Sequence, residues 1–145
     1  MLKKIYESLL AEGSMDRMPF RSDVDAGGQY RGLPFKKGST EIWYWNKKYG
    51  RDFMIAFDNK KFDKLIDPKN LSNTHEKLGT VDENDLEKIY YNMQGENWSP
   101  EGEARTFIKG SGTGHTSMSM GDIIVVHGVV HVVAMAGFYK MGKVK

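Results

Sequence analysis

Residues 122–134, DIIVVHGVVHVVA, decide the fold of this chain. Two runs rich in valine and isoleucine flank His127-Gly128, and a two-residue link whose second residue is glycine favours a tight β-hairpin. Such a link places Val126 opposite Val129, and it thereby fixes every other pair of the two strands. Because both faces of these strands are apolar, we expect the hairpin to lie inside a sheet that is covered on both sides.

A second hairpin is predicted over residues 41–57. Its two runs, EIWYWNK at 41–47 and RDFMIAF at 51–57, are rich in aromatic and branched residues. Alternation along the first run puts Trp43 and Trp45 on one face, and the tip of the hairpin carries three cations, Lys47, Lys48 and Arg51. Aromatic rings beside cations can stack on single-stranded nucleic acid, although two tryptophans on one strand face are more often part of a core.

Short helices and loops account for the remaining residues. Apolar spacing and capping residues predict four helices, over 2–11, over 60–66, after the N-cap Asp82, and from Ser99-Pro100 to Gly110. A short strand is predicted over 77–81, and residues 14–39 form an irregular segment. The pattern has no βαβ rhythm and no repeat, so it predicts a single compact α+β domain over residues 1–145, with a mainly antiparallel sheet and several short helices.

The composition is that of an ordinary globular domain. Of the 145 residues, 39% are hydrophobic and 28% are charged, which argues against wholesale disorder and against a membrane partner. Tyr6, Glu7 and Ser8 interrupt the stretch that a signal peptide would need to be apolar, so we expect a cytoplasmic protein. Cysteine is absent, which excludes disulfide scaffolds, cysteine zinc sites and thiol catalysis.

The net charge of +2 conceals a segregation of charge along the chain. Residues 36–77 hold ten basic and six acidic side chains, whereas residues 82–103 hold one basic and seven acidic side chains. A separated pattern can steer a polyanion to one face, but a net charge of +2 is a weak electrostatic footprint for a nucleic-acid binder. A solvated surface is the plainer interpretation of the basic region.

The densest group of reactive side chains lies in HTSMSMGD at residues 115–122. It combines the imidazole of His115, the carboxylate of Asp122 and three hydroxyls, those of Thr116, Ser117 and Ser119. Such groups can bind phosphate or perform acid/base chemistry. The alternative is structural: the hydroxyls satisfy backbone groups of a turn, and the carboxylate accepts hydrogen bonds from loop amides.

A second histidine, His131, extends this candidate site. In the predicted register His131 lies on the sheet face of Asp122, one diagonal step away, so the carboxylate could orient its imidazole. A small hydrolase or a metal site centred on His115, Asp122 and His131 is therefore an alternative. The spacing of these residues matches no established ligand pattern, and we predict no metal and no cofactor.

Three further candidate residues surround the turn that begins at Ser99-Pro100. The side chains of Trp98, Glu103 and Arg105 could line a ligand cleft together with His115. The plainer account is an ion pair between Arg105 and a neighbouring glutamate, with Trp98 packed as a plug.

Several of these segments together resemble a known family. They are the acidic helix LEKIY at 86–90, the linker NWSPEGEAR at 97–105, the turn GHTSMSMGDII at 114–124, and Gly137-Phe138. This order is similar to that of the YodL-like domain of bacteriophages and conjugative elements, over about residues 80–141. The chain differs from the commonest pattern in its inserted Thr116-Ser117 pair. The resemblance implies a viral or mobile-element origin, and it carries no reaction over to this chain.

These observations predict an accessory protein of phage or mobile-element type that acts without catalysis. We expect it to bind a host or viral protein in the host cytoplasm, through the side chains of Trp98, Glu103, Arg105, His115, Thr116, Ser117 and Ser119. A nucleic-acid-binding module that uses the hairpin 41–57 is the main alternative, and the small hydrolase is the second. The sequence carries no indication of oligomeric state.

Overall fold

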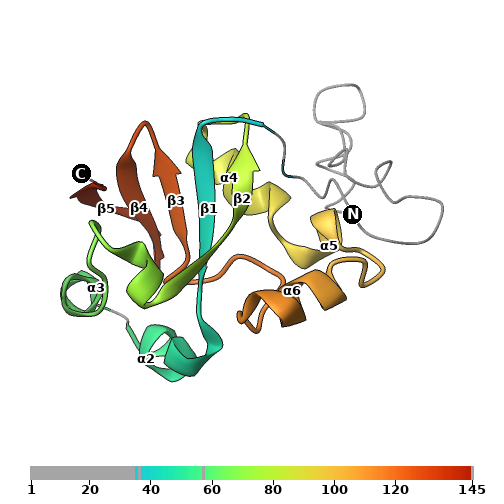
Figure 1. Cartoon of the computed structure of the whole chain (residues 1–145). Coiled ribbons are helices and arrows are strands. Elements are labelled where there is room, and N and C mark those ends of the chain that lie inside the picture. The colour runs from blue at the N-terminus through green and yellow to red at the C-terminus, as the bar shows by residue number, and fades with distance from the viewer. Residues whose placement is uncertain (1–34, 36, 57, 145) are drawn as a thin grey trace.

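The computed structural model describes residues 35, 37–56 and 58–144, in which five strands form one antiparallel sheet (Figure 1). The strands hydrogen-bond in the order β2-β1-β3-β4-β5. Their bounds are β1 Thr40–Trp45, β2 His75–Val81, β3 Ile123–Val126, β4 Val129–Ala134 and β5 Gly137–Lys143. The predicted helix at 2–11 and nearly all of the segment 14–39 lie outside the described residues.

Short helices connect the strands. They are α2 Gly50–Met54, α3 Asn59–Leu65, α4 Leu86–Asn92, α5 Gly95–Trp98 and α6 Arg105–Ser111, together with the 3-10 turns η2 Lys47–Tyr49 and η3 Leu71–Asn73. The α+β prediction is therefore confirmed. No helix among the described residues is long and apolar enough to cross a bilayer.

The central hairpin has the register that its sequence predicts. Val126 pairs with Val129 and Ile124 pairs with His131, and the backbone N–H of Val133 donates to the carbonyl of Asp122 over 2.9 Å. The link needs two residues in the left-handed region, and His127 and Gly128 have φ angles of 51° and 77°.

Both faces of the sheet are covered, as the apolar strands predict. One core contains Tyr44 and Ile124 from the sheet and packs them against buried side chains of α4, α5 and α6. The other core contains Trp45 and Ile123 and packs them against buried side chains of α2 and α3. Neighbouring residues of a strand thus enter opposite cores, because side chains alternate across a sheet.

The hairpin predicted over 41–57 is wrong. Its first run is β1, but β1 pairs with β2 and β3, and residues 50–54 form the helix α2. Only one large apolar side chain of α2, that of Phe53, is buried, while Met54 is exposed. The strand β2 contains the predicted 77–81, and the edge strand β5 was not predicted.

Two predicted helix starts also need correction. The helix α4 begins at Leu86 because the side chain of Asp85, rather than that of Asp82, accepts hydrogen bonds from the first backbone N–H groups. Pro100 does not begin a helix, since α5 ends at Trp98 and α6 begins at Arg105. The helix predicted at 60–66 is confirmed as α3, which Asp58 caps.

Gly121 offers a test of how tightly the turn before β3 is packed. Its φ angle is +97°, and a Cβ atom there would lie 2.7 Å from the ring of Phe53. Gly137 has a similar φ of +95°, but a Cβ atom would meet nothing within 4 Å. We expect Gly121→Ala to lower the free energy of unfolding by about 3 kcal/mol. The cost of the left-handed backbone adds to the cost of overpacking the new methyl group against Phe53. Gly137→Ala should cost only about 1 kcal/mol of strain. Urea unfolding of both variants measures this difference, and equal losses would contradict the packing described for Gly121.

Candidate functional site

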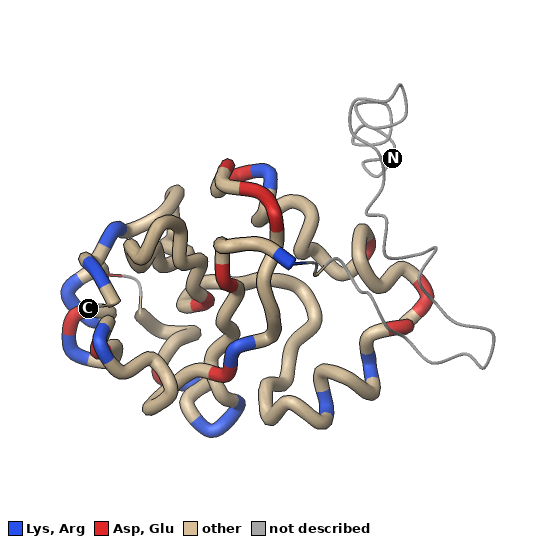
Figure 2. Tube along the Cα trace, turned by 45° about the horizontal axis from the view of Figure 1, so that its top comes forward, with Lys and Arg blue, Asp and Glu red and all other residues tan. Residues whose placement is uncertain are grey.

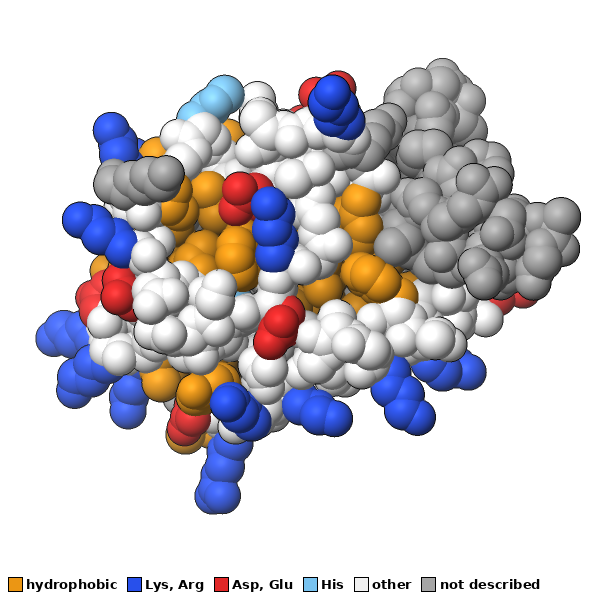
Figure 3. Space-filling view, viewed as in Figure 1, with side chains coloured by type: hydrophobic (Ala, Val, Ile, Leu, Met, Phe, Trp, Pro, Cys, Tyr) orange, Lys and Arg blue, Asp and Glu red, His pale blue; other side chains and the backbone are white. Residues whose placement is uncertain are grey.

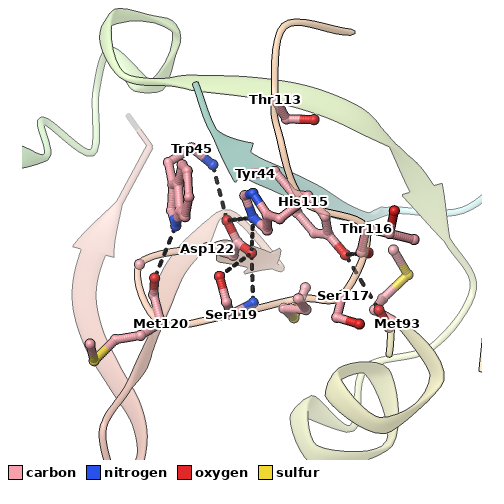
Figure 4. A network of polar contacts seen from close by, with 12 residues as sticks. Tyr44, Trp45, Met93, Thr113, His115, Thr116, Ser117, Ser119, Met120 and Asp122 are labelled. Atoms are coloured by element: carbon pink, nitrogen blue, oxygen red, sulfur yellow. Dashed lines mark hydrogen bonds and ion pairs between the residues drawn. The ribbon is translucent and has the colours of Figure 1, made fainter. Parts of the chain in front are cut away.

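The carboxylate of Asp122 is the centre of a buried polar network at the start of β3 (Figure 4). Its side chain has 0% exposure. Oδ1 accepts the backbone N–H of Trp45 over 3.0 Å, and Oδ2 accepts the backbone N–H of Ser119 over 2.7 Å. Nε2 of His115 donates to the same carboxylate, 2.7 Å from Oδ2. Three N–H groups, one from the end of β1 and two from the loop before β3, thus converge on one side chain.

The imidazole of His115 lies between two aromatic rings. The ring of Tyr44 is 4.5 Å away between centroids and nearly parallel at 9°, and the indole of Trp45 is 4.0 Å away at 29°. Nδ1 is buried and has no hydrogen-bond partner among the residues that the structure describes. Both faces of the imidazole therefore lie against aromatic rings and both nitrogens point into protein, while the side chain keeps 16% exposure.

We call residues 115–121 the anchored loop, because hydrogen bonds hold it along its whole length. The hydroxyl of Tyr44 and the indole Nε1 of Trp98 donate to the carbonyl of Thr116, over 2.7 and 3.0 Å. The hydroxyl of Ser117 accepts the backbone N–H of Gly95 over 2.6 Å. These bonds tie the first half of the anchored loop to β1 and α5.

The second half of the anchored loop is held from the other side. The indole Nε1 of Trp45 donates to the carbonyl of Met120 over 3.0 Å. Nε2 of His75 donates to the carbonyl of Gly121 over 2.8 Å, and Nδ1 of His75 accepts the hydroxyl of Thr74. The sequence offered no signal for His75, whose only notable feature is its position at the start of β2.

Burial is the largest influence on the pKa values of Asp122 and His75. It raises the pKa of the Asp122 carboxyl, against the opposing effect of the N–H groups of His115, Ser119 and Trp45. Burial also lowers the pKa of His75 to about 4, although its bond to Gly121 acts in the opposite direction. His75 is therefore neutral at pH 7, in the tautomer that carries its proton on Nε2.

A cavity of about 530 Å³ opens beside the anchored loop. Its wall combines apolar side chains with hydroxyls and contains neither a carboxylate nor a lysine or arginine; it is formed by Trp45, Met54, His115, Thr116, Ser117, Ser119 and Met120. The cavity has the size of an ordinary small-ligand or side-chain pocket.

The structure brings together only part of the predicted binding surface. His115, Thr116, Ser117 and Ser119 line the cavity. Trp98 is completely buried and packs as a plug whose indole holds the anchored loop. Glu103 and Arg105, in the turn before α6 and at its start, do not line this cavity.

Of the candidate hydrolase residues His115, Asp122 and His131, the structure joins the first two by a hydrogen bond. His131 pairs with Ile124 and Lys140 in the sheet, and the other hydrogen bonds shown for the carboxylate of Asp122 come from the backbone of Trp45 and Ser119. Within the described ranges no three histidine or acidic side chains gather as a metal site would require.

The aromatic and basic tip of the predicted hairpin 41–57 does not form either. Trp45 is 7% exposed and its indole is bonded to Met120, while the indole of Trp43 donates to the carboxylate of Glu41 over 2.9 Å. Lys47 and Lys48 are exposed in η2, and Arg51 is exposed in α2. The two tryptophans are therefore packing residues rather than a stacking platform.

The burial of His75 predicts a loss of stability in acid. The unfolded chain takes up a proton near pH 6.5, whereas folded His75 does so near pH 4. Its contribution is thus fully present above pH 6.5 and is lost as the pH falls towards 4, by about 3 kcal/mol in total. Urea unfolding between pH 7 and pH 4 should show this slope in the wild type and in His127→Asn, an exposed control, but a shallower slope in His75→Gln. Parallel slopes in all three would contradict the prediction.

The substitution Asp122→Asn tests whether the three N–H groups bonded to this carboxylate stabilise the fold. An amide presents one N–H₂ group where the carboxylate presents an acceptor, so one inward N–H loses its partner in a buried site. We expect a loss of about 3 kcal/mol in the free energy of unfolding. Asp85→Asn is the matched control, because its side chain caps an exposed helix end that asparagine caps equally well. An Asp122→Asn loss no larger than that of the control would contradict the account.

No family model, no curated protein and no solved structure matches this chain. The resemblance of residues 80–141 to the YodL-like domain therefore stays a prediction. The candidate site is interpreted from its own geometry.

Proposed function

We propose that the chain is a non-catalytic protein-binding module, and that the cavity beside the anchored loop receives an apolar side chain of the partner. The cavity wall supplies apolar area from Trp45, Met54 and Met120, and it also contains hydroxyl-bearing residues. Methionine is unbranched and adapts its shape to varied side chains. Met54 is 63% exposed at this cavity, so it offers apolar contact area that the protein's own core does not use.

The observation that carries the proposal is the set of hydrogen bonds that hold the backbone of the anchored loop. Binding costs free energy when loops must be ordered at the interface. Here the backbone carbonyls of Thr116, Met120 and Gly121 already accept hydrogen bonds from buried side chains. A partner would thus meet a preformed surface, which favours specific binding.

The geometry of His115 supports binding over hydrolysis. A general base must reach the proton that it removes, directly or through one water. Nε2 of His115 faces Asp122, Nδ1 is buried, and the ring faces lie against Tyr44 and Trp45. The hydroxyl of Ser117 accepts a backbone N–H of Gly95 instead. The pair His115–Asp122 acts in this proposal as a structural clamp.

The origin of the partner rests on the resemblance of residues 80–141 to the YodL-like domain. A protein of phage or mobile-element type would bind a host or viral protein. Because the cavity wall is mainly apolar and carries no acidic or basic side chain of Asp, Glu, Lys or Arg, the bound segment would present an uncharged, apolar side chain.

The test uses peptides selected from a random display library against the full chain. We expect the enriched peptides to share one apolar anchor residue. Fluorescence anisotropy with a synthetic copy should give an affinity that changes less than about threefold between low and high salt, because no phosphate contacts are involved. Met54→Asp should weaken binding at least about tenfold, since a carboxylate is costly to desolvate.

Met135→Asp is the matched control for Met54→Asp. Met135 is 64% exposed, and it lies in the turn between β4 and β5, outside the cavity wall. The control should bind like the wild type. Equal binding by the Met54→Asp variant would contradict the proposal, as would a steep salt dependence or preferential binding of an oligonucleotide.

A further inference from the structure

The strand β5 is an open edge of the sheet. It pairs with β4 along Gly137–Lys143, and β4 is the only strand beside it in the described part of the chain (Figure 1). The outer side of an edge strand carries backbone N–H and C=O groups that no neighbouring strand satisfies, and such a row can pair with an added strand. The edge therefore has the backbone chemistry to accept an extended segment.

Positive side chains surround this edge. Lys140 and Lys143 are exposed on β5 itself. The helix α3 lies alongside, since the ring of Phe62 stacks 6.2 Å from that of Tyr139, and the Tyr139 hydroxyl donates to Asp63 over 2.8 Å. Three exposed lysines belong to α3, namely Lys60, Lys61 and Lys64. Figure 2 marks several lysine and arginine positions along the trace on this side of the molecule, and Figure 3 shows lysine and arginine side chains projecting from the same side.

The acidic groups nearby are fewer and are already engaged. Asp58 caps α3 by accepting the backbone N–H of Lys60, and Asp63 accepts the hydroxyl of Tyr139. The helix α3, its N-cap residue and β5 together therefore contain five lysines and two aspartates. The local field is positive, so it attracts carboxylates and repels cations.

We infer that the open edge of β5 binds an extended acidic segment of a partner protein, which adds to the sheet as a sixth strand. Backbone hydrogen bonds to β5 provide the pairing, and the lysines of β5 and α3 select glutamate and aspartate. A second copy of this chain is a poor occupant, because β5 paired with itself brings like charges together at one edge. This surface is separate from the cavity beside the anchored loop.

The test measures binding of a fluorescent ten-residue peptide of alternating glutamate and valine to the full chain. We expect the acidic peptide to bind, and its lysine–valine counterpart to bind at least about tenfold more weakly. The double variant Lys140→Glu/Lys143→Glu should lose at least tenfold in affinity. Lys48→Glu/Lys109→Glu makes the same change of charge at exposed sites outside β5 and α3, and it should retain most of the binding.

Strand addition is separated from general charge attraction by methylation of the peptide backbone. Successive N–H groups of a strand point to opposite edges of that strand. Two peptides are therefore made, one N-methylated at alternate residues along one edge and the other N-methylated at alternate residues along the opposite edge. We expect one of them to lose at least tenfold in affinity and the other to bind like the parent. If both bind like the parent, or if the two double variants lose equally, the inference is overturned.

The same assay separates this inference from the proposed function. Met54→Asp alters the cavity but not β5, so it should bind the acidic peptide like the wild type. Loss of acidic-peptide binding in that variant would overturn the assignment to β5, whereas loss of the selected apolar peptides alone concerns only the cavity.

Discussion

One buried carboxylate determines how the parts of this protein meet. An acidic group without contact to water is costly unless donors surround it. The donors of Asp122 are the backbone N–H of Trp45 at the end of β1, the backbone N–H of Ser119 in the anchored loop, and the imidazole of His115. Satisfying this single side chain therefore fixes the end of β1, the course of the anchored loop and the start of β3 relative to one another.

Under the proposed function, the same constraint favours recognition over acid/base chemistry at this site. The imidazole that satisfies Asp122 is enclosed by the aromatic rings of β1, and His75 supports the far end of the anchored loop from β2. The polar side chains of Asp122 and His75 are engaged in hydrogen bonds to the backbone of β1 and of the anchored loop. Under the proposal, a partner would contact the apolar wall around Met54 and Met120 and the hydroxyl-bearing residues that line the cavity.

The fold could be predicted from the sequence where its contacts are local. The register of β3 and β4 follows from the tight link at His127-Gly128. The run 51–57 resembles a strand in composition. However, β1 pairs with the distant strands β2 and β3, and the first residues of the run belong to the helix α2. Residue type placed His115 and Asp122 in one candidate group, but the expected partner of the carboxylate was His131 and not His115. The backbone donor of Trp45 lies 77 positions from Asp122, beyond any spacing rule.

The central claim is that Asp122 joins β1 to the anchored loop as part of the cooperative core. Amide hydrogen exchange at the N–H groups of Trp45 and Ser119 measures this directly, because an amide bonded within the core exchanges only when the whole protein unfolds. The account predicts that the opening free energies of both amides equal the global free energy of unfolding and fall with it as urea is added. Rapid exchange of either amide through a local opening that is insensitive to urea would contradict it.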